Sequence, residues 1–146
     1  MDDPLTAAVS DAPGRPNRPP VFLGRRDGHD LARAYAALDV FVHPGTRETF
    51  GQTLQEAAAT GLPVLAPARG GPLDLVQHGV SGFLFDPACP GDLGSWAAGL
   101  AASPRLRAEL GGAGLARVAG RSWAAVVEQL LAHYGAVVRG GSARAA

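Results

Sequence analysis

The chain has 146 residues, the size of one domain, and 47% of them are hydrophobic, which excludes a wholly disordered chain. Thirteen arginines balance thirteen acidic residues and there is no lysine, so neither a basic excess for nucleic acid nor lysine chemistry is expected. The one cysteine, Cys89, excludes an internal disulfide and a cysteine-based zinc cluster. No apolar run reaches the roughly 18 residues of a membrane span, and the acidic start is unlike a signal peptide. We therefore expect a cytoplasmic protein.

The first predicted elements follow a proline-rich start. Residues 1–20 are too poor in large apolar side chains to order themselves and are predicted to be a disordered tail. The domain is expected over residues 21–140, beginning with a short strand at Val21–Leu23. A helix is expected next, with Asp30 as its N-cap. Its apolar face is formed by Leu31, Ala34, Tyr35 and Leu38. Residues 39–43 then predict a buried strand.

The same alternation continues through the middle of the chain. Residues 51–60 predict a helix that ends at Gly61 and buries Leu54, Ala57 and Ala58. Residues 63–66 predict a third strand and residues 82–85 a fourth. Between them, a helix is expected from Gly70-Gly71 to about His78, with its apolar side chains directed inward: Leu73, Leu75 and Val76.

These elements predict an α/β fold with a Rossmann-like parallel sheet of about four strands flanked by helices, because the strands are apolar on both faces. Three helices are predicted in the rest of the chain. The first covers residues 92–102, and the second has Pro104 in its first turn. The third begins at Ser122 as its N-cap and ends at about Val138. Residues 141–146 are expected to form a second tail. The last helix carries a long apolar face: Trp123, Val126, Val127, Leu130, Leu131, Tyr134 and Val138.

Most of the chemical signal lies between Glu48 and Glu56. Glu48 follows a strand and Glu56 lies in the next helix, so about 10 Å is expected between their carboxylates, too far apart for the acid and base of a glycosidase. Between them, Phe50-Gly51 begins the helix, where free N–H groups and the helix dipole favour an anion. This order suits a nucleotide sugar, whose sugar, diphosphate and ribose would lie along it at the carboxyl edge of the sheet.

Structural roles are the alternatives for these residues. The alternative for Glu48 is a capping or first-turn carboxylate of the helix, and the alternative for Glu56 is a solvated helix residue. Gly70-Gly71 fits a tight turn as well as a donor contact, and His43 fits a structural histidine as well as a ligand contact. Asp27, His29 and Asp30 have no spacing typical of a metal site. The remaining arginines are expected on a solvated face: Arg105, Arg107, Arg117 and Arg121.

One long, ordered signature identifies a family resemblance. It consists of His43-Pro44, Glu48-Thr49-Phe50-Gly51-Gln52-Thr53-Leu54-Gln55-Glu56-Ala57, Gly61-Leu62-Pro63-Val64-Leu65-Ala66, Gly70-Gly71 and Gly79-Val80-Ser81-Gly82-Phe83-Leu84. It resembles the donor site of retaining, family-4 glycosyltransferases of GT-B fold, in their C-terminal domain. Residues 70–76 also resemble GDP-mannose-dependent α-mannosyltransferases. The resemblance implies transfer of a hexosyl group from a nucleotide diphosphate sugar with retention at the anomeric carbon, without a bound metal or other cofactor.

The resemblance also implies residue roles. Glu48, the expected catalytic residue, would hydrogen-bond hydroxyls of the transferred sugar. Phe50 and Gly51 would line the sugar and diphosphate through their backbone, and Glu56 would accept both ribose hydroxyls. The expected donor site is completed by Gln52, His43 and Arg25.

The chain departs from this family in what it lacks. The family's N-terminal domain, which holds most of the acceptor site, is missing, as are the strands that carry an Arg and a Lys for the donor diphosphate. The chain alone is therefore expected to supply part of a donor site and to be inactive. The alternative is a non-catalytic remnant with weak or no nucleotide binding.

Further expectations concern partners and place. The acceptor, a lipid or a glycan, stays unassigned, and the intact enzyme is expected in the cytoplasm or at the inner face of the membrane. In the family the last helix reaches the N-terminal domain, so its apolar face is expected to be partly exposed here and to favour self-association. A related epimerase or phosphorylase is a further alternative, although the missing lysine opposes a phosphorylase with a lysine-bound cofactor.

Overall fold

A computed structural model describes residues 20–142 of the chain. Three parallel strands form one sheet in the order β1-β2-β3. They are β1 (Phe41–Val42), β2 (Val64–Pro67) and β3 (Gly82–Phe85). In the register, Phe41 lies opposite Val64, and Val64 lies opposite Gly82. The prediction of an α/β fold with a parallel sheet is therefore confirmed.

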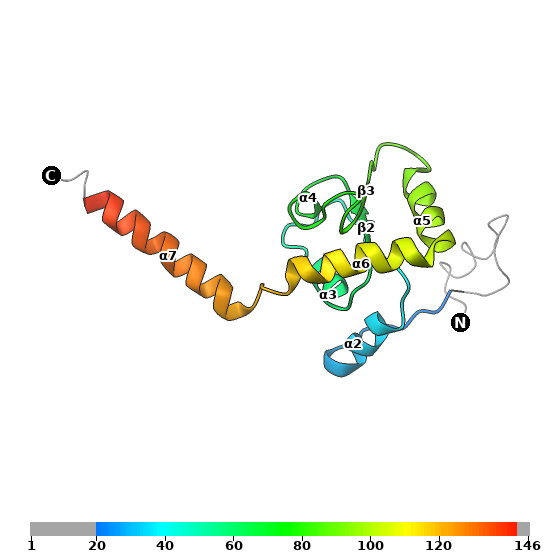
Figure 1. Ribbon diagram of the computed structural model, residues 1–146, viewed down its shortest axis with the longest axis horizontal. Helices are drawn as coiled ribbons and strands as arrows, with labels where there is room; N and C mark the ends of the chain where they lie inside the picture. The colour runs from blue at the N-terminus through cyan, green and yellow to red at the C-terminus, as the bar shows by residue number, and fades with distance from the viewer. Residues whose placement is uncertain (1–19, 143–146) are drawn as a thin grey trace.

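Helices cover both faces of the sheet (Figure 1). They are α2 (Gly28–Ala36), α3 (Gln52–Ala59), α4 (Pro72–Leu75), α5 (Asp92–Ala102), α6 (Pro104–Val118) and α7 (Trp123–Ser142). Alternate residues of β2 point to opposite faces, as in any strand. Val64 packs with side chains of α2 and α3, whereas Leu65 packs with side chains of α5 and α6. Two cores, one on each side of the sheet, hold the strands in place.

The helix that carries the predicted site, α3, has clearly defined ends. Gly51 precedes it in a left-handed conformation, with φ of 65°. At the other end, the N–H of Gly61 donates to the carbonyl of Ala58 and the N–H of Leu62 donates to that of Ala57. This is a Schellman motif, and it confirms Gly61 as the residue that ends the helix. Leu54, Ala57 and Ala58 are buried as expected.

The predicted first strand at Val21–Leu23 is wrong, and the sheet within the described residues has three strands rather than four. Val21 is 80% exposed, and Phe22 and Leu23 are exposed as well. A strand needs a neighbouring strand to pair its backbone groups, and β1 pairs only with β2 in the described part of the chain. Apolar sequence alone therefore does not produce a strand at residues 21–23.

Several other predicted elements are shorter or shifted. β1 is two residues long and Val42 is exposed, so the buried strand over residues 39–43 is only partly correct. The N-cap of α2 is Asp27, and Asp30 lies in the first turn. The helix predicted to reach His78 is the short α4, and Leu73 on it is exposed rather than inward. β1 is at the edge of the sheet in the described part of the chain, and α4 has only four residues. The periodicity of apolar residues does not predict where such short elements begin and end.

Arg107, at the corner between α5 and α6, does not lie on the solvated face that the sequence predicts. Its guanidinium donates to the carbonyls of Leu100 and Ala101 at 2.8 and 3.1 Å, and contacts Asp39 at 3.4 Å. Arg107 therefore caps the end of α5 and does not belong to a solvated face. Ser103 caps the start of α6, where Pro104 occupies the first turn as expected.

The last helix, α7, extends away from the sheet (Figure 1). The Ser122 hydroxyl accepts from the N–H of Ala125 at 3.2 Å, which confirms it as the N-cap. The helix runs to Ser142, four residues beyond the expected end and into the first part of the expected 141–146 tail. The rest of that tail and residues 1–19 of the expected N-terminal tail lie outside the described residues.

Candidate functional site

The site is built where β1 leads into α3, and Glu48 lies at its centre. Its Oε1 accepts hydrogen bonds from the N–H groups of Thr49, Phe50 and Gly51 at 3.0, 3.1 and 2.7 Å. These bonds, the one from Gly51 above all, lower the pKa of Glu48. The sequence predicted free N–H groups for an anion at Phe50-Gly51. In the structure the carboxylate of Glu48 occupies them, so the prediction of free donors there is wrong.

His43 faces the other oxygen of the same carboxylate. Its Nε2 lies 3.8 Å from Oε2 of Glu48, and it has no hydrogen-bond partner among the described residues. The backbone N–H of His43 donates to the carbonyl of Leu65 at 2.9 Å, which continues the ladder between β1 and β2. Two of the predicted site residues are therefore brought together at the carboxyl end of β1.

Gly70-Gly71 supports the backbone that carries Glu48. The N–H of Gly71 donates to the carbonyl of Glu48 at 3.1 Å. A Cβ on Gly71 would lie 2.6 Å from the carbonyl oxygen of Thr49, a distance that side chains do not tolerate. The glycines thus let the turn before α4 press against the Glu48–Thr49 segment. This contact accounts for them structurally without a donor contact.

Glu56 lies in the second turn of α3 and is held at both oxygens. Oε2 accepts from the hydroxyl of Tyr35 on α2 at 3.2 Å, and Oε1 accepts from the side-chain amide of Gln52 at 3.3 Å. Burial, followed by the charge of Glu56 and this hydrogen bond, raises the pKa of Tyr35 to about 12. Tyr35 therefore keeps its proton at neutral pH and donates to Glu56.

Glu56 also lines a hollow of about 280 Å³ between α3 and the α6–α7 junction. The lining residues are Phe50, Gln52, Gln55, Glu56, Ala59, Val118, Arg121, Trp123 and Val126. Three of them, Phe50, Gln52 and Glu56, are predicted site residues. The mixture of exposed aromatic rings with carboxylate, amide and guanidinium groups suits a ligand that has both a flat ring and hydroxyl groups.

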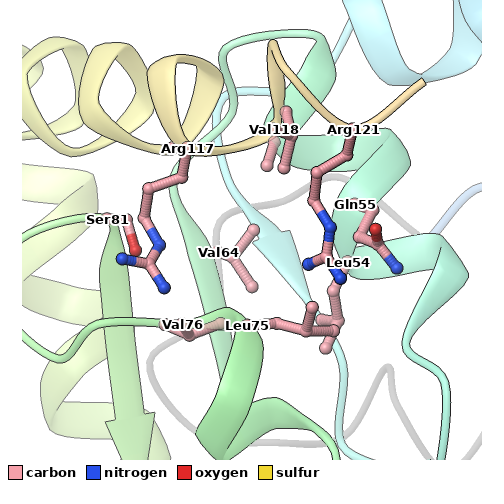
Figure 2. Close-up of a pocket in the computed structure, with 11 residues that line it drawn as sticks. Leu54, Gln55, Val64, Leu75, Val76, Ser81, Arg117, Val118 and Arg121 are labelled. Atoms are coloured by element: carbon pink, nitrogen blue, oxygen red, sulfur yellow. The ribbon is translucent and has the colours of Figure 1, made fainter. Parts of the chain in front are cut away.

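A second, smaller hollow lies behind α3 and has a different character (Figure 2). Its volume is about 40 Å³, room for a few water molecules but not for a nucleotide. Figure 2 shows the side chain of Arg117, from α6, and that of Arg121, from the segment after α6, reaching over aliphatic groups that include Leu54 and Val76. Arg117 also contacts the side chain of Gln77 at 3.4 Å. We assign this hollow a packing role.

The remaining predicted site residue, Arg25, is not brought to these carboxylates by any contact that the structure shows. Its exposed guanidinium pairs with Asp27 at 3.1 Å before α2. Within residues 20–142, no three His, Cys, Asp or Glu side chains are close enough together to hold a metal ion. Cys89 is free and exposed. No helix in the described part of the chain is long and apolar enough to cross a membrane.

Comparison with known proteins agrees with this geometry. The family described as glycosyl transferases group 1 matches residues 20–114, which include all the elements from β1 to α5. The chain belongs to the group 1 glycosyl transferases. The matched region contains both Glu48 and Glu56.

Individual relatives in this glycosyl transferase family have names that specify a substrate. A GDP-mannose-dependent alpha-mannosyltransferase of Mycolicibacterium smegmatis is 47% identical over 129 residues, which are 86% of this chain and 33% of that protein. A D-inositol 3-phosphate glycosyltransferase of Mycolicibacterium vanbaalenii is 41% identical over 84% of this chain and 27% of its own length. The chain thus spans about a third of the length of the curated relatives that it matches.

Solved structures show the same GT-B glycosyltransferase fold. Sucrose-phosphate synthase of Thermosynechococcus elongatus superposes with a TM-score of 0.73 at 33% identity, over 82% of this chain and 30% of that one. HepE of Anabaena, in complex with UDP and glucose, superposes with a TM-score of 0.69 at 30% identity, over 80% of this chain and 32% of that one. The fold predicted from the motif is confirmed.

Sequence reasoning missed Tyr35 and Arg121 as residues near the site. The sequence pattern places Tyr35 only on the apolar face of its helix. The available signal was its hydroxyl, since a buried tyrosine needs a hydrogen-bond partner and the following helix carries a carboxylate. Arg121 gave no such signal, because its position beside α3 depends on how α6 ends.

Proposed function

We propose that this chain forms part of the donor site of a hexosyltransferase that uses a nucleotide diphosphate sugar and retains the configuration at the anomeric carbon. Mannose from GDP-mannose is the favoured donor, because relatives at 41–47% identity are named GDP-mannose-dependent alpha-mannosyltransferases. By the family resemblance, the transfer needs no resident metal or other cofactor. The N-terminal part of such an enzyme would bind the acceptor.

The observation that carries this proposal is the pair of oriented carboxylates on either side of the N-terminus of α3. Oε1 of Glu48 is held by three backbone N–H groups, so its Oε2 is presented in a fixed direction for a sugar hydroxyl. Glu56 opens into the larger hollow beside Phe50, where a nucleoside would lie. Ribose hydroxyls donate well to a carboxylate, which has acceptor capacity on both oxygens.

Titration of the 146-residue chain with GDP, GDP-mannose and UDP tests the proposal. We expect weak binding that raises the melting temperature by about one or two degrees at millimolar ligand, with amide shifts in the NMR spectrum around Gly51 and Gln52. Glu56→Gln should weaken GDP binding about tenfold, because it removes a charged acceptor. Glu109→Gln, on the exposed surface of α6, is the matched control and should bind as the wild type does.

Each result of this titration has a defined meaning. Binding that Glu56→Gln reduces, while Glu109→Gln does not, supports a donor site. Equal binding by all three proteins rules out Glu56 as the nucleotide contact. No binding of any nucleotide at tens of millimolar would favour a remnant without a donor site.

A further inference from the structure

Tyr35 is the side chain that connects α2 to the site. It is 7% exposed, and its ring packs 5.5 Å from that of Phe41 within the core that also contains Leu54. Its hydroxyl lies at the edge of this core and reaches Oε2 of Glu56 at 3.2 Å. Because close packing fixes the ring, the position of the hydroxyl is fixed as well.

The carboxylate of Glu56 has a second support from its own helix. Gln52, one turn earlier, donates to Oε1 at 3.3 Å. Each oxygen of a carboxylate has about two acceptor positions, so one position remains on each oxygen after these bonds. Two adjacent hydroxyl groups of a ligand match two neighbouring acceptors held at fixed directions.

We infer that Tyr35 is a positioning residue that holds the carboxylate of Glu56 to receive the two hydroxyls of a ribose. This inference rests on the proposed function, since it specifies how the nucleotide part of the donor is recognised. Tyr35 itself does not line the hollow and would not touch the ligand. Its effect is to restrict the rotamers of Glu56, which lowers the entropy lost when the ribose binds.

The test compares the affinities of each protein for two ligands, one with and one without the ribose hydroxyls. A general loss of stability would lower both affinities and leave their ratio unchanged. The affinities of the 146-residue chain for GDP and for 2′,3′-dideoxy-GDP are measured by NMR titration. The wild type should prefer GDP about tenfold, because the dideoxy ligand has no hydroxyls for the two acceptor positions that Tyr35 and Gln52 leave open on the carboxylate. Tyr35→Phe removes only the hydroxyl and should lower this preference to about threefold. Tyr134→Phe, on exposed α7, is the matched control and should keep the full preference.

Glu56→Gln separates this inference from the proposed function. If the wild type prefers GDP, Glu56→Gln loses the preference and Tyr35→Phe lowers it, both stand. If Tyr35→Phe keeps the full preference while Glu56→Gln loses it, the positioning role of Tyr35 is wrong and the donor site remains. If the wild type itself does not distinguish the two ligands, the ribose contact and the inference built on it are both overturned.

Discussion

At the scale of single residues, Glu48 has a structural role beside the ligand contact that we propose for it. Its Oε1 accepts from three N–H groups of the loop that leads into α3, those of residues 49–51. The turn at Gly71 holds the backbone of Glu48 from the other side. No side chain caps α3, whose N-cap is Gly51, so the capping alternative for Glu48 is wrong. Glu48 orders the preceding loop through Oε1 and leaves Oε2 towards His43.

The lowered pKa of Glu48 predicts how stability depends on pH. Its ionised form is favoured in the folded state, so the stabilisation is complete above the ordinary glutamate pKa of about 4.3 and is lost as the pH falls through the lowered value. Glu48→Gln should therefore have a lower urea midpoint than the wild type at pH 6, and the difference should shrink towards pH 3. Glu128→Gln, at an exposed position of α7, is the control. A difference that stays constant over this pH range would contradict the prediction.

The residues of the site were only partly predictable. The spacing of Glu48 and Glu56 around Phe50 correctly predicted that a helix start would separate the two carboxylates. Sequence could not reveal that Glu48 takes the N–H groups itself, because this depends on side-chain torsions in the loop. The bond from Tyr35 to Glu56 depends on how α2 packs against α3, and no local pattern encodes that contact.

At the scale of elements, the position of α3 depends on its contact with α6. Gly111 and Gly114 are buried on α6 and let its backbone approach the neighbouring elements closely. A Cβ on Gly111 would overlap the carbonyl oxygen of Gly61, at the end of α3. Periodicity predicted both helices but not this contact, since a glycine in a helix has the same pattern whether it is packed or exposed.

Two adjacent glycines make this contact testable. Gly111→Ala should destabilise the fold by about 1–3 kcal/mol, because the new methyl group must displace the backbone at Gly61. Gly112→Ala has open space around its Cβ and should stabilise the fold by roughly 0.5–1 kcal/mol through helix propensity. Urea unfolding of both variants gives the comparison. Equal effects of the two substitutions would show that α6 does not pack against Gly61 as described.

At the scale of the whole molecule, the apolar surface at the two ends of the described chain is exposed. Residues 21–23 have no strand beside them, and the sheet edge at β1 is formed by two residues only. The parallel direction of the strands and the core around β2 were predictable because strand and helix alternate. The state of residues 21–23 was not, since pairing depends on a neighbouring strand and not on the segment itself.

The helix α7 also exposes apolar side chains, and several of them follow one another at spacings of four and three residues along the helix. These exposed side chains are Trp123, Val127, Leu130, Tyr134 and Val137. Such a spacing is typical of a helix that packs along another helix. The exposed face is expected to favour self-association, with a second copy of the chain covering it.

Sedimentation velocity over about a hundredfold range of concentration tests this association, which mass action makes concentration-dependent. The wild type should change from monomer to dimer as concentration rises. Leu130→Glu should remain monomeric, because it places a charge in the middle of the apolar contact. Ala132→Glu adds the same charge two residues away, on the opposite side of α7, and should dimerise as the wild type does. A wild type that stays monomeric at every concentration, or an Ala132→Glu variant as impaired as Leu130→Glu, would contradict pairing through this face.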